Sequence, residues 1–64
     1  MTRDKFLEIY PAMRKYGGSF VQALAECFIY ADNINFALLS VTFPEIIDEY
    51  RRMADLDKKK ETAS

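Results

Sequence analysis

The one residue that could act as a thiol nucleophile lacks the partner such chemistry requires. The sequence contains a single cysteine, Cys27, and no histidine, so no imidazole is available to activate the thiol. Cys27 also falls on an apolar stripe with helical spacing, where a cysteine is usually an inert packing residue. We therefore expect Cys27 to belong to the core and not to an active site.

Two acidic pairs, Asp48 with Glu49 and Asp55 with Asp57, are the other candidates for catalysis. Neighbouring acids on a charged helix are usually solvated, whereas general acid–base catalysis needs a carboxyl group whose pKa is shifted by its surroundings. We expect these acids to lie on the surface. The sequence thus predicts no catalytic residue and no enzyme.

The sequence also lacks the residues that a phosphate-binding loop, a structural metal site or an internal disulfide would need. Gly17-Gly18 lacks both the following Lys and the glycine spacing of a phosphate-binding loop. A structural zinc site needs four Cys or His ligands, and one cysteine cannot form an internal disulfide. No metal and no cofactor is predicted, and a single unpaired cysteine is typical of a cytoplasmic protein.

Charge argues against nucleic acid and membrane partners. The formal net charge is −1, and segment 33–42, the best candidate for a recognition helix, contains no Lys or Arg. The run Lys58-Lys59-Lys60 is typical of a solubilising tail. A helical nucleic-acid-binding regulator, pooling basic residues from the first helix and the tail of a dimer, stays the alternative. No apolar run approaches the roughly 18 residues of a membrane span.

The pattern of apolar residues and helix-capping residues predicts an all-α domain, with three to four short helices packed around a central helical hairpin. Thr2 or Asp4 could cap a first helix, which Pro11 either kinks or divides. Gly17 is expected to end it in a left-handed conformation. Ser19 and Gln22 form a capping-box pattern for the second helix, Asp32 caps a third that ends near Thr42, and Pro44 begins the last.

The expected core follows from apolar spacing along each helix. Its members are Phe6, Leu7, Tyr10 and Met13, then Phe20, Leu24, Cys27, Phe28 and Ala31, then Phe36, Leu39 and Phe43, and finally Ile46, Ile47, Tyr50, Met53 and Ala54. One domain is expected over residues 1–56. Residues 57–64 are polar without apolar periodicity and are expected to form a disordered tail.

A shortage of charge is the most informative feature of the chain. Of the 29 positions from Tyr16 to Pro44, only Glu26 and Asp32 are charged. Either the charged outer helices cover this hairpin, or part of it contacts another protein, which could be a second copy or a foreign chain. The expected partner interface comprises Phe28, Ile29, Ile34, Leu38 and Val41.

A wider pattern covers about residues 16–54. Its elements are Tyr16-Gly17-Gly18-Ser19-Phe20-Val21-Gln22-Ala23-Leu24-Ala25, then Ala31-Asp32, then Phe43-Pro44-Glu45 with Tyr50. It resembles a group of small, uncharacterised bacteriophage and prophage proteins, whose members often have Pro where Asn33 stands here. The resemblance carries no catalytic residues. It implies a protein in an infected bacterial cell that binds, and inhibits or modulates, a host or phage protein, including defence systems.

Overall fold

Four helices make up the part of the chain that the structure describes, and they confirm the predicted all-α class. The computed structural model describes the backbone of residues 1–63 and the side chains of residues 1–59. The helices are α1 (Arg3–Tyr16), α2 (Ser19–Tyr30), α3 (Asn33–Thr42) and α4 (Pro44–Ala63). No strand occurs within residues 1–63.

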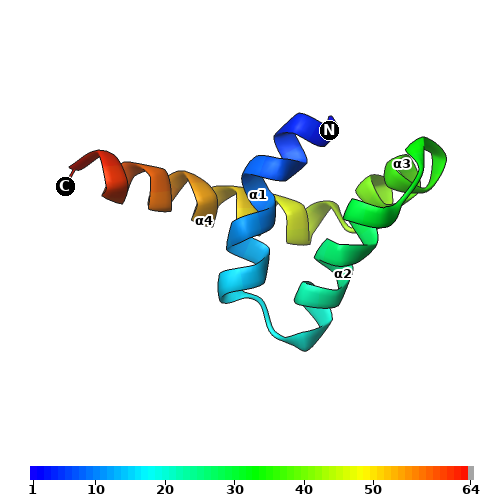
Figure 1. Ribbon diagram of the computed structural model, residues 1–64, viewed down its shortest axis with the longest axis horizontal. Helices are drawn as coiled ribbons and strands as arrows, with labels where there is room; N and C mark the ends of the chain where they lie inside the picture. Colours follow the sequence, from blue (N-terminus) through cyan, green and yellow to red (C-terminus); the bar gives the residue numbers. More distant parts are fainter. Residues whose placement is uncertain (64) are drawn as a thin grey trace.

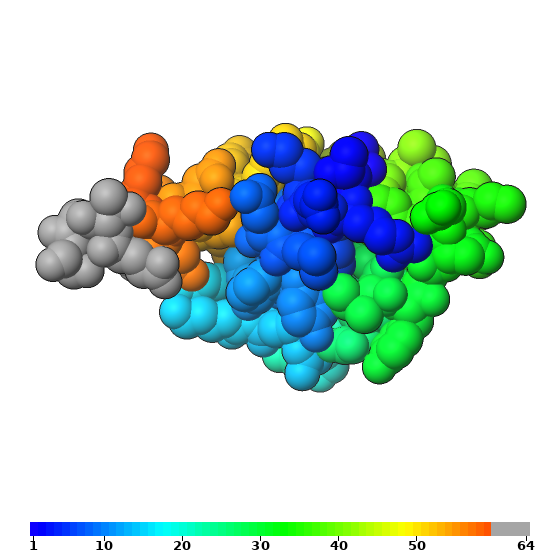
Figure 2. All heavy atoms as spheres, turned by 45° about the horizontal axis from the view of Figure 1, so that its top comes forward, coloured from blue at the N-terminus to red at the C-terminus, as the bar shows by residue number. Residues whose placement is uncertain are grey.

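The helices contact one another in chain order, and α1 closes the ring by packing on α4. The most extensive contact is the one between α1 and α4, which cross near the middle of α4 in Figure 1. α2 and α3 lie to one side of this crossing, and the end of α4 extends away on the other. Figure 2 shows the N-terminal residues lying against the green residues of the α2–α3 region.

An aromatic cluster forms the centre of the core. The rings of Phe6 and Phe28 stack with centroids 4.6 Å apart, and the ring of Phe36 meets Phe28 edge-on at 5.5 Å. Such pairs add to the stabilisation that burial alone provides. No polar or charged side chain is buried among those that the structure describes. The other buried residues are Ile9, Ala12, Met13, Leu24, Ala25, Ile47, Tyr50 and Ala54.

Several helix ends lie at the residues that the sequence predicts. The Thr2 hydroxyl accepts a hydrogen bond from the backbone N–H of Lys5, and an Asp32 carboxylate oxygen accepts one from the N–H of Asn35 at 2.7 Å. α4 begins at Pro44, as predicted. Pro11 is exposed inside an α1 that continues on both sides of it, so the second alternative, two separate helices, is wrong.

The Gly17-Gly18 connection differs from its prediction. Gly17 has φ −77° and ψ 151°, an extended conformation and not the expected left-handed one. A Cβ atom at Gly17 would lie 2.5 Å from both the Met13 carbonyl oxygen and Val21 Cγ1, so close packing explains this glycine. The capping box is also wrong, because Gly18 is the N-cap of α2 and the Gln22 amide instead donates to the carbonyls of Arg14 and Gly17.

The domain end expected at residue 56 does not coincide with the end of regular structure. α4 continues through Ala63, so its backbone helix extends beyond residue 56, where the sequence placed the end of the domain and the start of the tail. Within this segment, the Asp57 carboxylate accepts a hydrogen bond from the Tyr16 hydroxyl, which ties this turn of α4 to the end of α1. Ser64 lies outside the described residues.

Candidate interaction surface

α3 contributes one fully buried side chain to the core, Phe36, and one partly buried side chain, Leu39, that packs against it. Phe36 is the one buried residue of this helix, where it contacts Phe6 and Phe28. The Arg3 guanidinium lies 4.8 Å from the Phe36 ring and donates a hydrogen bond to the carbonyl of Ala31, just before α3 begins. These contacts fix the inner side of α3 and leave its opposite side uncovered.

The outer face of α3, defined here as Ile34, Leu38 and Val41, is apolar and exposed. The three side chains retain 74%, 56% and 74% of their accessible surface. Their spacing of four and three residues places them along one side of the helix, facing away from Phe36. Since α3 is apolar on its inner and outer sides alike, it has the composition of a helix that is covered on both.

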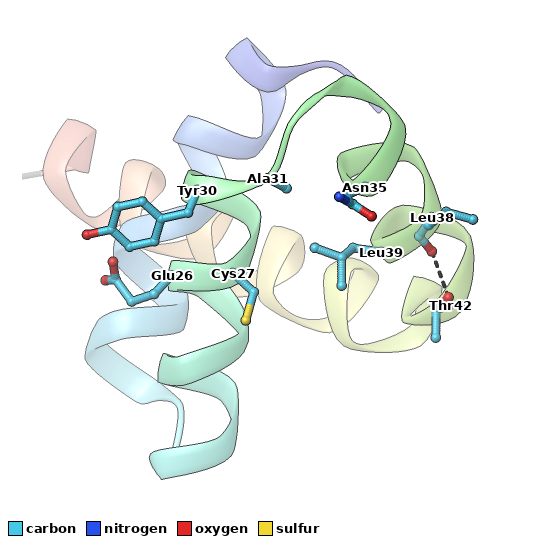
Figure 3. A pocket seen from close by; sticks show the side chains of 8 residues that line it. All are labelled: Glu26, Cys27, Tyr30, Ala31, Asn35, Leu38, Leu39 and Thr42. Carbon is cyan, nitrogen blue, oxygen red and sulfur yellow. Dashed lines mark hydrogen bonds between the residues drawn. The ribbon is translucent and has the colours of Figure 1, made fainter.

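A groove between α2 and α3 adjoins this face, with a volume of about 510 Å³. In Figure 3, Cys27 and Leu39 point into the space between the helices, and Leu38 projects from α3 at its edge. Tyr30, which is 83% exposed, stands on the α2 side. Ala31, Asn35, Thr42 and Glu26 complete the lining. Grooves of this apolar character accept an amphipathic helix in many protein complexes.

The five residues predicted as an interface divide into three groups. Ile34, Leu38 and Val41 lie together on the outer face. Phe28 is fully buried against Phe6, so its assignment to an interface is wrong: its place on the inner side of α2 makes it core. Ile29 is partly exposed but lines a separate recess with Arg3 and Leu7, away from the groove.

Sequence reasoning missed the residues that α2 contributes to the groove. Cys27 was expected in the core but is exposed, and Tyr30, also exposed, was not among the expected interface residues. The buried side of α2 is centred on Leu24, Ala25 and Phe28, which turns Cys27 towards α3. The usable signal was Tyr30 three residues after Cys27, since that spacing puts both on one side of the helix.

The charged groups beside the groove are engaged by α1. Arg14 lies 3.6 Å from the Glu26 carboxylate, and the Tyr10 hydroxyl donates a hydrogen bond to the same carboxylate. That hydrogen bond, followed by desolvation, raises the pKa of Tyr10 above its ordinary value. α3 itself carries neither Lys nor Arg, so this surface offers no cation for a phosphate backbone.

Other kinds of site find no support in the described residues. Within residues 1–59, no three His, Cys, Asp or Glu side chains come together as metal ligands. No described helix is both long enough and apolar enough to cross a membrane. Comparison with protein-family models, curated proteins and solved structures finds no match to this chain.

Proposed function

We propose that this chain is a protein-binding module that acts by occupying a partner's surface through α3, without catalysis. The observation that carries the proposal is the exposure of Ile34, Leu38 and Val41 on a helix that has no charge. Burying apolar surface stabilises a complex by about 25 cal/mol per Å² before the costs of association are subtracted. The resemblance to phage proteins suggests a host or phage protein as the partner, whose activity the complex inhibits or modulates.

The inner and outer sides of α3 have different roles, and this difference supports the proposal. Phe36 and the Arg3 contacts hold the helix in place, so the outer face is not needed for the internal packing of the domain. A preformed, rigid helix loses little conformational entropy when it binds. The adjacent groove extends the apolar surface from α3 onto α2, where Tyr30 supplies a residue type enriched at binding hot spots.

Photo-crosslinking in bacterial cells tests the proposal. The photoreactive amino acid p-benzoylphenylalanine replaces Leu38 in one variant and Leu56, on α4, in the control. The two leucines are 56% and 58% exposed, so the positions are matched in type and accessibility. We expect a discrete cross-linked protein from position 38 and none from position 56. Equal products at both positions, or none at position 38, would contradict the proposal.

The second stage measures binding with purified proteins. The protein identified by mass spectrometry is titrated with the wild-type chain, with Val41→Asp and with Leu56→Asp. A carboxylate at position 41 would be desolvated in the complex, so we expect at least about tenfold weaker binding. Leu56→Asp should bind like the wild type. Equal affinity for all three chains would place the contact elsewhere.

A further inference from the structure

The absence of charge on α3 restricts the surfaces that can cover it. A partner that placed a charged side chain against Ile34, Leu38 or Val41 would bury that charge without a counter-ion, which is strongly unfavourable. Helices α1, α2 and α4 each contain charged residues, whereas α3 contains none. Among the four helices of this chain, the outer face of α3 is therefore matched best in charge by another α3.

We propose that the outer face of α3 binds the same face of a second copy, with the two helices antiparallel about a two-fold axis at Leu38. This inference rests on the proposed function, because it uses the same surface, and it names the partner class. In this arrangement Leu38 contacts Leu38 of the partner subunit, and Ile34 faces Val41 of the partner subunit. Such an interface is isologous, so it closes after two copies.

The spacing of the apolar residues suits this symmetry. Leu38 lies four residues after Ile34 and three before Val41, so reversing the helix direction nearly superimposes the stripe on itself. Intervals of four and three residues also form the seam along which paired helices pack. Ala37 is exposed beside the stripe, and its small side chain permits the two backbones to approach.

The available area sets the expected strength of the dimer. A stable interface buries about 800 Å² per partner, roughly a sixth of the 4600 Å² surface of this molecule. α3 has 10 residues and is about 15 Å long, so its stripe alone falls short of that area. The structure thus assigns a weak dimer, with a dissociation constant in the micromolar range or above.

Sedimentation equilibrium of the purified full chain is the direct test. From about 1 µM to about 1 mM, the mean mass of the wild type should rise from 7.4 kDa towards twice that value. Leu38→Asp should keep it at the monomer mass, because the two-fold axis would bring two carboxylates together, and Leu56→Asp should behave as the wild type. A wild type that stays monomeric, or two variants that dimerise equally, would overturn the inference.

Disulfide trapping tests the antiparallel geometry without relying on a disruptive variant. In a Cys27→Ser background, Leu38→Cys is compared with Leu56→Cys under mild oxidation by copper–phenanthroline. The two-fold axis at Leu38 predicts rapid formation of a covalent dimer from the first variant and slow formation from the second. Equal rates would overturn the proposed axis.

The two proposals fail in different ways. If the purified chain is monomeric while position 38 cross-links to a different protein in cells, the dimer is wrong and the protein-binding function stands. If it dimerises and position 38 cross-links only to a second copy, the dimer is supported, and the proposal that α3 binds a host or phage protein is wrong. If neither association occurs, both proposals are wrong.

Discussion

The Tyr16 hydroxyl donates one bifurcated hydrogen bond to the Asp57 carboxylate, with the two oxygens 2.8 and 3.1 Å away, and so joins the last residue of α1 to α4 across 41 positions of sequence. Lys15 lies 4.0 Å from the same carboxylate. Asp57 is thus part of the folded domain, although the sequence around it is polar. The contact ties a turn of α4 beyond residue 56 to the end of α1.

Removing this contact should lower stability slightly. Tyr16→Phe keeps the ring and deletes the hydroxyl, and we expect the free energy of unfolding to fall by about 0.5–1.5 kcal/mol. Urea unfolding followed by circular dichroism measures the change. Tyr30→Phe is the control, because Tyr30 is 83% exposed and should change stability little. Equal effects from both variants would show that the Asp57 contact contributes nothing.

The two glycines should respond oppositely to substitution. Gly17→Ala places a Cβ atom 2.5 Å from the Met13 carbonyl oxygen and from Val21 Cγ1, and we expect a loss of about 1–3 kcal/mol. Gly18→Ser meets open space, supplies a cap for α2 and restricts the unfolded chain, so a gain of about 0.5–1 kcal/mol is expected. Thermal unfolding compares the two, and similar shifts in Tm would refute the packing explanation of Gly17.

The two sides of α3 should differ in their effect on stability. Phe36→Ala removes the anchor of this helix and should cost about 3–5 kcal/mol, a large part of the stability of a domain this small. Val41→Ser, on the outer face, should change the unfolding free energy by less than about 0.5 kcal/mol. Both values come from urea unfolding at low protein concentration. A large loss in Val41→Ser would mean that the outer face packs within the monomer.

The Tyr10–Glu26 hydrogen bond should make stability depend on pH in the alkaline range. The phenol is the donor, and the contact raises the pKa of Tyr10 above 10.0, so the native state holds this proton more tightly than the unfolded chain. The stabilisation is complete below pH 10 and is lost as pH rises through the raised pKa. The unfolding free energy of the wild type should therefore converge on that of Tyr10→Phe at high pH. Parallel curves from about pH 9 to about pH 12 would contradict this.

The exposure of Cys27 predicts that its thiol reacts in the folded protein. At low protein concentration, the thiol reagent DTNB should modify the native chain at a rate comparable with that of the urea-unfolded chain. A thiol that reacts only after urea is added would show that Cys27 is a core residue after all.

The sequence by itself determined the helices and several of their ends. Thr2 and Asp32 cap their helices, and α4 begins at Pro44. These features depend on backbone sterics and on hydrogen bonds that reach three or four residues, so a short stretch of sequence is enough to predict them. The shortage of charge in segment 33–42 was equally visible, and it led to Ile34, Leu38 and Val41.

Only the tertiary structure decided which side of α2 is buried. Apolar residues surround much of this helix, so periodicity alone could not choose between Phe28 and Cys27, and the choice followed from where the Phe6 ring of α1 lies. The same holds for Gly17. Only a glycine fits there, because a Cβ atom would collide with Val21 on the next helix. The contact of Asp57 with Tyr16, 41 positions earlier in the sequence, likewise appears only in the tertiary structure. Each of these outcomes depends on contacts between helices, which local patterns do not encode.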